Sequence, residues 1–369
     1  MCKRILASQT NTEEGVPFYK IGTIGNAPDA YISKELFDDY KTKYNYPHKG
    51  EVMITCAGTV GKCVIYDGKD AYYQDSNIVW IDNPSQCISN SFLYHLLAKV
   101  DWRKLNSTTI IRIYNDDLRN LKLNYPQIEE QQKISRLLSL LDERIATQNK
   151  IIDKLQSLIK GIADNILDNP LWKKTYLRSF MQFFSTNSLS WEQLSYEEGE
   201  IRNLHYGLIH GFFTSGIKSY SLPMVKYGEM PKQYTLCQVG DVAFADASED
   251  TDEIGKSVEF VDTIKGDTIC GLHTIHGRDI KNRTVVGFKG FAFNSRYFHN
   301  QIKRLAQGTK VFSITANNLS SCYVYLPDLE TQKAIVNLLK TYEAKLLVSK
   351  RLLEHYEKQK QYLLRQMFI

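Results

Sequence analysis

The chain has 369 residues, of which 43% are hydrophobic and 24% charged, and its formal net charge is +5. This composition is ordinary for a globular protein, and the length predicts two or three domains that each bury a core. No run of residues approaches the ~18 apolar residues of a membrane-spanning helix, and residues 1–10 contain no apolar core of signal-peptide length. We therefore expect a cytoplasmic protein.

Residues 1–124 are mostly strand-like, with short apolar runs separated by turn residues. These runs lie at 52–55, 63–66 and 77–81. Residues 31–44 are polar and are expected to form a loop. A short helix is predicted over 91–105, directly before the small polar triplet Ser-Thr-Thr at 107–109.

A six-residue element occurs twice in the chain. Pro-Gln-Ile-Glu-Glu-Gln at 126–131 returns as Pro-Asp-Leu-Glu-Thr-Gln at 327–332. Proline and the carboxylates after it favour the first turn of a helix. The apolar residues that follow step alternately by four and three, which is the 3.5-residue period of a coiled-coil seam. We therefore predict two long amphipathic helices that pair with each other.

The predicted seam has matching polar breaks in its two copies. Its residues are Ile134, Leu138, Leu141, Ile145, Gln148, Ile152 and Leu155 in the first helix and Ile335, Leu339, Tyr342, Leu346, Ser349, Leu353 and Tyr356 in the second. Gln148 and Ser349 interrupt the stripes at equivalent places near mid-helix. An antiparallel pairing would bring them close together, and one polar layer there could fix the register at some cost in stability.

The segment between the two helices, 170–325, looks like a diverged copy of residues 1–124. The signposts that recur in order are Pro17-x-x-Lys20-x-Gly22 with Pro223-x-x-Lys226-x-Gly228, Gly50-Glu51-Val52 with Gly240-Asp241-Val242, Gly61-Lys62 with Gly255-Lys256, and the triplet 107–109 with 308–310. In the second copy a strand is predicted over 284–288 and a short helix over 295–305. Two similar scaffolds with different surfaces suit two modules that recognise different things.

The predicted fold is α+β, with two globular modules that are each followed by a long helix. The four segments are 1–124, 125–169, 170–325 and 326–369. We expect the helices to pair as an antiparallel coiled coil, which gives the chain approximate internal two-fold symmetry. Duplex DNA has its own dyad symmetry and is the foremost target for such an arrangement.

The charges of the second module are segregated along the sequence. Residues 241–267 carry nine acids and two bases, whereas 278–310 carry eight bases and one acid, Asp279. A segregated basic face is the footprint expected for a phosphate backbone, and a solvated surface with chance clustering is the alternative. The residues predicted to contact the DNA backbone are Lys20, Lys62, Arg112, Lys226, Lys256, Arg283, Arg296, Lys303, Arg304 and Lys310.

Two motifs hint at phosphate chemistry but do not complete its pattern. The run between Cys56 and Cys63 is similar to a phosphate-binding loop, yet those cysteines occupy the positions where the Walker spacing needs glycine and serine or threonine. Asp29, Asp39 and Lys41 are similar to the acid-acid-lysine cluster of metal-dependent nucleases. Motifs this short often arise by chance, so we predict no catalytic residue.

The seven cysteines include no C-x-x-C pair and are expected to be reduced thiols. Cys270-x-x-His273-x-x-His276 has the residue types of a metal site. A buried thiol followed by histidines in a turn is the preferred interpretation, so no metal site is predicted.

With two diverged modules that each end in the P-x-[IL]-E-x-Q helix, the chain resembles the specificity (S) subunit of type I restriction-modification systems. The resemblance covers nearly the whole chain and is strongest over 125–167 and 326–369. Residues 18–22 and 58–62 also look like parts of the target-recognition domains of that family.

This resemblance implies a DNA-binding subunit that does not catalyse. Each module would read half of a bipartite target, while the helices set the gap and dock two methyltransferase (M) subunits. It implies no cofactor in this chain. S-adenosylmethionine would serve the M subunits in adenine methylation, and ATP and Mg²⁺ would serve the partner subunits, including the restriction/motor (R) subunits that translocate and cut double-stranded DNA.

One departure from the family pattern leaves alternatives open. Residues 172–177 look like the opening of a family domain, and no equivalent precedes Cys2. The first module is therefore expected to lack its initial element, and a silent or truncated allele is one alternative. The others are a coiled-coil scaffold that does not bind DNA and a stand-alone nuclease that depends on Asp39.

Overall fold

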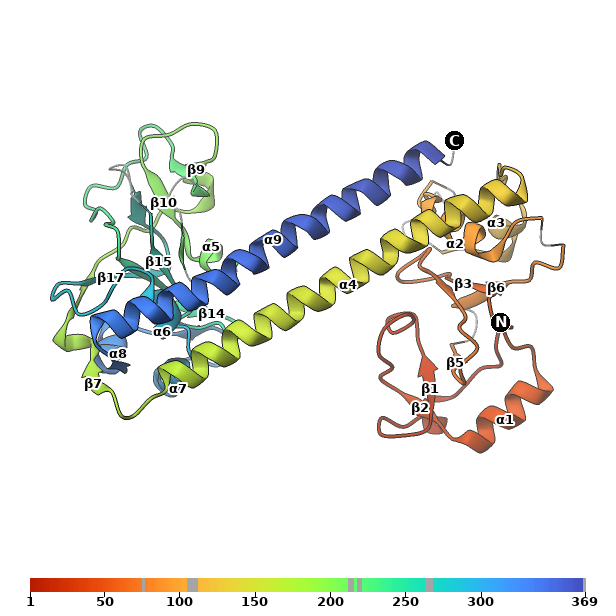
Figure 1. Ribbon diagram of the computed structural model, residues 1–369, viewed down its shortest axis with the longest axis horizontal. Helices are drawn as coiled ribbons and strands as arrows, with labels where there is room; N and C mark the ends of the chain where they lie inside the picture. Colours follow the sequence, from red (N-terminus) through yellow and green to blue (C-terminus); the bar gives the residue numbers. More distant parts are fainter. Residues whose placement is uncertain are drawn as a thin grey trace. The chain divides into compact units, whose positions relative to one another are not determined.

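The computed structural model describes residues 1–74, 77–85, 87–104, 112–211, 216–217, 221–262 and 268–367. They form two compact units, which Figure 1 draws in sequence colours. Unit 1 consists of Met1–Asn149 and Leu352–Ile369, and unit 2 consists of Lys150–Arg351. The triplet 107–109 lies outside the described residues, so its match with 308–310 stays a prediction. Within the described ranges, no helix has both the length and the apolarity that a membrane crossing requires.

The globular part of unit 1 has two sheets, with strand orders β2-β1-β5 and β4-β3-β6. Its strands are β1 (Val16–Tyr19), β2 (Tyr31–Ile32), β3 (Val52–Thr55), β4 (Cys63–Ile65), β5 (Tyr72–Tyr73) and β6 (Ile78–Ile81). Its helices are η1 (Ala7–Gln9), α1 (Lys34–Lys43), α2 (Asn90–Lys99) and α3 (Asn115–Arg119). Helix α2 ends earlier than the predicted 91–105, because the chain turns to an extended conformation at Val100.

Helix α1 replaces most of the loop that we predicted for residues 31–44. The Ser33 hydroxyl accepts a hydrogen bond from the Leu36 amide at 3.2 Å, which caps the helix, and Lys41 and Lys43 lie in its last turn. Phe37 is completely buried. No other residue of α1 is buried to that degree, so the helix had almost no apolar periodicity to predict it.

The globular part of unit 2 has a four-stranded sheet, β16-β10-β12-β9, a five-stranded sheet, β11-β15-β13-β17-β8, and two strand pairs. Its strands are β7 (Lys173–Tyr176), β8 (Met181–Phe184), β9 (Leu194–Ser195), β10 (Arg202–Leu204), β11 (Gly216–Ile217), β12 (Met224–Val225), β13 (Val242–Ala245), β14 (Ala247–Ser248), β15 (Ser257–Phe260), β16 (Thr268–Cys270), β17 (Thr274–Asp279), β18 (Phe312–Ser313) and β19 (Tyr323–Leu326). Its helices are η2 (Leu177–Ser179), η3 (Trp191–Gln193), α5 (Tyr206–Gly211), α6 (Phe288–Ala292), α7 (Arg296–Leu305) and α8 (Ala316–Ser321).

The strand predicted over 284–288 is wrong. Asp279 Oδ2 accepts a hydrogen bond from the Thr284 amide at 2.8 Å, and Gln332 Oε1 accepts one from the Val285 amide at 3.0 Å. These amides are therefore not available to a strand ladder. Gly287 then adopts a left-handed φ of 94°, and helix α6 begins at the next residue.

The two units share a core of equivalent elements in the same order. Strand β3 pairs antiparallel with β4 and β6, and β13 pairs antiparallel with β15 and β17. A helix with a serine N-cap follows in each unit, namely α2 after Ser89 and α7 after Ser295. The hairpin contacts also recur, because the amides of Gly50 and Gly240 donate to the carbonyls of Tyr66 and Phe260. The repeat in the sequence is therefore a repeat in structure.

Two of the repeated glycines have a steric reason to be glycine. Gly61 has φ +84°, and a Cβ atom there would lie 2.2 Å from the ring of Trp102. Gly255 has φ +71°, and a Cβ atom there would lie 2.6 Å from Ile302. Each hairpin turn therefore needs a residue without a side chain, because a bulky neighbour covers it.

The two long helices, α4 (Ile128–Leu167) and α9 (Leu329–Met367), contribute to both units and are antiparallel (Figure 1). In unit 1 the first turns of α4 pack on the last turns of α9, with Ile134 and Leu138 in one apolar cluster with Leu364. In unit 2 the end of α4 and the start of α9 share the larger core, which includes Leu167 and Leu339.

Along both helices the predicted seam is the less exposed stripe. Ile134, Leu138, Leu141, Gln148, Ile152, Ile335, Leu339 and Leu346 are buried, and Ile145, Leu155, Tyr342, Ser349, Leu353 and Tyr356 are half-buried. In unit 1 the Lys360 ammonium forms an ion pair with Asp142, and the Arg144 guanidinium lies 5.9 Å from the centre of the Tyr356 ring. The contact predicted between Gln148 and Ser349 stays a prediction.

The last residue of the repeated six-residue element fastens each helix to its module. Gln131 Oε1 accepts a hydrogen bond from the Ser89 amide at 2.8 Å, and its Nε2 donates to the carbonyls of Cys87 and Pro126, both at 2.9 Å. Gln332 does the same with the Val285 amide and with the carbonyls of Arg283 and Pro327, all at 3.0 Å.

Both glutamine side chains are completely buried. We call this arrangement the glutamine clamp. It explains why the element repeats, because an amide is the side chain that can donate and accept at the same buried place.

The modules differ where they meet their helices. In unit 2 strand β7 pairs antiparallel with β19, which leads into α9. In unit 1 the described residues 121–127, which lead into α4, carry no paired strand.

Candidate nucleic-acid interface

The separation of charges along the second module is partly undone by folding. Arg278 donates to both carboxylate oxygens of Asp241, at 2.8 Å and 2.7 Å, and His276 Nε2 lies 2.7 Å from the same carboxylate. Burial alone would raise the pKa of Asp241, but the hydrogen bonds from Arg278 and His276 outweigh it and hold the pKa below its usual value. This cluster belongs to the interior of the module.

A second base of the 278–310 run is also inside the protein. Lys289 is 2% exposed, and its ammonium lies 3.0 Å from Oε1 of Glu259, which is completely buried. The expectation of one continuous basic face is therefore wrong for Arg278 and Lys289. Acids from 241–267 neutralise them, which the linear sequence could not indicate because the partners are 30 or more residues apart.

Helix α7 presents three of the remaining basic residues of this region. Phe298 and Ile302 are completely buried, while Arg296, Lys303 and Arg304 are exposed on the helix. The Ser295 hydroxyl caps the helix by accepting from the Phe298 amide, and the Arg296 amide donates to Asp164 of α4 at 2.6 Å. The last turn carries Lys303 and Arg304, where cations stabilise the carboxyl end.

Three predicted residues line one groove of unit 2, with a volume of about 560 Å³. They are Lys256, Arg296 and Lys303, and Lys160 of α4 adds a fourth cation. The groove is not uniformly basic, because Lys256 lies 3.0 Å from Glu253 and Lys303 forms an ion pair with Asp252. A phosphate would have to compete with these carboxylates.

Arg283, Arg304 and Lys310 are exposed, and so is Arg296. None of these four side chains has an ion-pair partner within the described ranges of the chain. These cations could therefore bind an anionic ligand without first breaking an internal ion pair.

The two lysines that recur in register both have internal partners. The Lys20 ammonium lies 3.1 Å from Asp29. Lys226 donates to the carbonyl of Glu192 at 2.7 Å. Lys62 is half-buried at the turn before β4, and Arg112 lies 5.9 Å from the centre of the Tyr114 ring.

The structure brings together the two segments of unit 1 that look like the family. The Thr59 hydroxyl donates to the carbonyl of Ile21 at 3.4 Å, so residues 58–62 lie against residues 18–22. This contact places the turns that hold Lys20 and Lys62 next to each other. Residues 57–62 form the turn between β3 and β4 and do not precede a helix, so they lack the geometry of a phosphate-binding loop.

The acid-acid-lysine cluster proposed for a nuclease is not assembled. Asp29 pairs with Lys20, Asp39 lies 2.5 Å from Lys43, and Lys41 lies 3.2 Å from Asp70. Each group therefore has a different partner.

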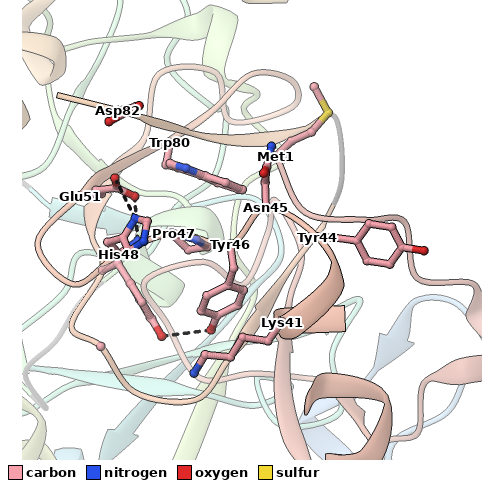
Figure 2. Close-up of a pocket in the computed structure, with 12 residues that line it drawn as sticks. Met1, Lys41, Tyr44, Asn45, Tyr46, Pro47, His48, Glu51, Trp80 and Asp82 are labelled. Carbon is pink, nitrogen blue, oxygen red and sulfur yellow. Dashed lines mark hydrogen bonds and ion pairs between the residues drawn. The ribbon is translucent and has the colours of Figure 1, made fainter. Parts of the chain in front are cut away.

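A pocket of about 700 Å³ in unit 1 combines aromatic and polar side chains, as Figure 2 shows. Tyr44, Tyr46 and Trp80 contribute rings, and the His48 amide donates to Glu51 at 2.7 Å. Burial raises the pKa of Tyr46 well above its usual range, and this hydroxyl lies 3.0 Å from that of Tyr66. Sequence patterns did not indicate this pocket because its residues come from separated turns.

Solved structures define the class of fold. A type I restriction-modification S subunit from M. genitalium aligns with 100% of this chain and 92% of that one, with a TM-score of 0.57 and 16% identity. A chain from a structural study of complex assembly and conformational transition of the type I R-M system aligns with 95% and 90%, with a TM-score of 0.56 and 14% identity. At these identities the likeness concerns the fold, which is that of two modules joined by paired helices.

The model of the type I restriction modification DNA specificity domain matches residues 1–157 and 271–357, which is more than half of the chain. The protein therefore belongs to this family of specificity subunits. The family name describes recognition and not catalysis, as the sequence indicated.

Two relatives illustrate the range of similarity. The specificity subunit S.HindORF215P assigned to a type I restriction enzyme of Haemophilus influenzae is 48% identical over 160 residues, which are 43% of this chain and 41% of that protein. The type I restriction enzyme MjaVIII specificity subunit of Methanocaldococcus jannaschii is 24% identical over 306 residues, which are 77% and 71%. High identity to the first relative is thus confined to less than half of each chain.

Proposed function

We propose that this chain directs a type I restriction-modification complex to a bipartite target in double-stranded DNA. Residues 1–124 and 170–325 would each read one half-site, and the helical segments 125–169 and 326–369 would set the gap between the half-sites. Two methyltransferase (M) subunits with S-adenosylmethionine, and restriction/motor (R) subunits with ATP and Mg²⁺, would supply the chemistry. This chain would supply no cofactor for it.

The repeated core with its glutamine clamps carries this proposal. Two modules have equivalent strands, turns and helices, and each is fastened to the start of a long helix by the same two hydrogen bonds of a glutamine side chain. Outside this core the modules differ in strands and in charge. Such a protein holds two different surfaces on one repeated frame, which suits a target with two different halves.

Phosphate contacts would come first from the exposed cations that have no ion-pair partner among the described residues, namely Arg283, Arg296, Arg304 and Lys310. Lys20, Lys226, Lys256 and Lys303 would have to exchange an internal partner for a phosphate, so their net contribution would be smaller. Base edges would be read in the grooves by polar side chains of the modules.

Substituting Arg304 and Lys310 together by alanine tests the phosphate contacts. Each lost contact is expected to reduce the slope of log affinity against log salt by ~1 and to weaken binding to all sequences alike. The measurement is fluorescence anisotropy of the complex with its M subunits on duplex DNA at several salt concentrations. Lys358→Ala, which removes an exposed charge from α9, is the matched control. An unchanged slope in the double variant would exclude this surface.

Lengthening both helices tests their role in setting the gap. One heptad inserted after Gln148 and one after Ser349 would add ~10 Å to each helix, which corresponds to ~3 base pairs. Methylated adenines mapped in cells that carry the variant should then show a longer gap and unchanged half-sites. An unchanged gap would reject the proposal that the helices set the distance between the half-sites.

A scaffold that does not bind DNA is separated from this proposal by one comparison. The wild-type chain with its cognate M subunits should retard duplex DNA in a gel, and the M subunits alone should not. Retention of the M subunits by the chain without any retention of DNA would favour the scaffold.

A further inference from the structure

Two cysteines and a histidine that are far apart in the sequence meet inside unit 2. Cys237 precedes β13, Cys270 ends β16 and His276 lies in β17. One potential ligand atom from each of the three residues lies within 4.8 Å of the other two. The three side chains are 6%, 3% and 1% exposed. His276 is therefore not the turn histidine that we expected.

The His273 side chain, by contrast, contacts Asp246. Its Nδ1 lies 3.0 Å from that carboxylate, and its backbone is left-handed, with φ 54°. The ligand set that the fold assembles is thus different from the Cys270, His273 and His276 run in the sequence, because Cys237 replaces His273.

We propose that Cys237, Cys270 and His276 bind a thiophilic divalent metal ion, for which Zn²⁺ is the probe. The two sulfur atoms are 3.6 Å apart. Two thiolates around a tetrahedral zinc ion, each at ~2.3 Å, would be about 3.8 Å apart, so little movement is needed. Three protein ligands leave one coordination position for water or another small ligand.

The contact with Asp241 indicates which nitrogen of His276 would be the ligand. The Asp241 carboxylate accepts hydrogen bonds from Arg278 and from the Gln238 amide. An ionised carboxylate has no proton to donate, so His276 Nε2 must be the donor in their contact and must carry the proton. The lone pair of the neutral imidazole is then on Nδ1. Histidine ligands of metal ions commonly donate their other N–H to a carboxylate in this way.

The charges of the site would balance. Binding of Zn²⁺ would displace one proton from each thiol to the solvent, and two thiolates would neutralise the ion. The imidazole would stay neutral, and Asp241 is already paired with Arg278. A buried cluster without net charge avoids the cost of an unpaired ion in the interior.

The metal would join two sheets of the module. Cys270 belongs to the sheet β16-β10-β12-β9 and His276 to the sheet β11-β15-β13-β17-β8. Cys237 lies in the segment between them, where its amide donates to the carbonyl of Thr268 at 2.8 Å. The bound ion would therefore stabilise the module and would take no part in DNA chemistry.

The metal content of the purified full-length chain tests the proposal independently of DNA binding. We expect about one zinc ion per wild-type chain and less than ~0.2 in Cys237→Ser and Cys270→Ser, measured by plasma mass spectrometry. Cys322→Ser is the matched control, since it removes a buried thiol of the same unit outside the cluster and should keep the zinc.

Two further measurements on the wild-type chain do not depend on how the variants fold. Co²⁺ added to metal-free protein should give the absorption bands of a tetrahedral thiolate site, and a chelator should lower the melting temperature. Zinc below ~0.1 per chain after growth in added zinc, without cobalt bands, would overturn the proposal. A disulfide between Cys237 and Cys270 in the freshly purified chain would overturn it as well, in favour of a redox pair.

Discussion

The two units share a backbone framework and differ in the side chains that form their interiors. The glutamine clamps of Gln131 and Gln332 make equivalent hydrogen bonds, and the turns at Gly61 and Gly255 are both left-handed and covered by a bulky side chain. The interiors are unlike. Unit 1 is rich in tyrosine contacts such as Tyr46 with Tyr66 and Tyr72, whereas unit 2 buries ion pairs such as Lys289 with Glu259.

This difference separates two kinds of constraint on a repeated module. The clamp and the turns leave little choice of residue, because a buried amide must be satisfied and a crowded turn must lack a side chain. The rest of the core needs suitable volume and satisfied polar groups, which either aromatic rings or ion pairs can provide. The backbone framework is therefore recognisable in both copies, while the side chains of the two interiors differ.

The buried ion pair of unit 2 should give the largest effect. Lys289→Met leaves Glu259 charged and unpaired in the core, and we expect unit 2 to lose ~3–5 kcal/mol of stability. Lys289→Met with Glu259→Leu should recover most of that loss. Urea denaturation followed by a probe in unit 2 measures both. If Lys289→Met loses no more stability than a variant that removes an exposed ion pair, the contrast between the two interiors is contradicted.

Unit 1 should show its own dependence on pH through His95. Burial lowers the pKa of this histidine to about 4, so the folded unit holds it neutral. The unfolded chain takes up the proton near pH 6.5, so stability is present above that pH and is lost as the pH falls towards 4. The loss is on the order of 2–3 kcal/mol.

His95→Leu should flatten this loss in unit 1 when its unfolding is followed between pH 7 and pH 4. Burial also lowers the pKa of His205 and His299, so unit 2 also loses stability as the pH falls below 6.5 and is the internal comparison. If the substitution leaves the pH dependence of the stability of unit 1 unchanged, that dependence comes from another group.

The clamps should respond alike in both units. Gln131→Ala and Gln332→Ala each leave a partly buried backbone amide without its acceptor, and a loss of ~1–3 kcal/mol is expected in each case. Gln→Glu at the same positions keeps the shape and removes the donor. Thermal unfolding of the four variants gives the comparison. Losses that differ widely between the copies would show that the shared geometry does not have a shared energetic role.

The exposed ion pair of Lys303 with Asp252 should give the smallest effect. Lys303→Met is expected to change stability only slightly, because solvent screens the pair and the long lysine side chain loses conformational freedom when it forms. Urea denaturation under the conditions used for Lys289→Met measures it. A loss as large as that of the buried pair would remove the distinction drawn between inner and outer charges.

The sequence predicted the long helices and their pairing well because both signals are local. A seven-residue period and a proline before two carboxylates can be seen in one stretch of chain. Helix α1 could not be predicted in the same way, since Phe37 is its one deeply buried residue. The strand predicted at 284–288 failed because Asp279 and Gln332 take its amides, and neither partner is visible in the apolar pattern.

The candidate interface was predicted less well, for a similar reason. The sign of a charge is known from the sequence, but its partner is not. Arg278 and Lys289 looked like surface bases until the fold brought Asp241 and Glu259 to them. The ten predicted backbone contacts therefore remain predictions.

The shared helices have a consequence for how such a gene can change. The core of unit 1 includes Leu364, whose codon lies far from those of Ile134 and Phe92, with which it packs. A recombination event that replaces the first module alone must therefore supply a partner for a residue encoded near the other end of the chain. Exchange between relatives should succeed with breakpoints at the six-residue elements, where the junction is the same in both copies. The constraint on exchange therefore falls on the residues at the helix ends, which must pack against a module and against the other helix.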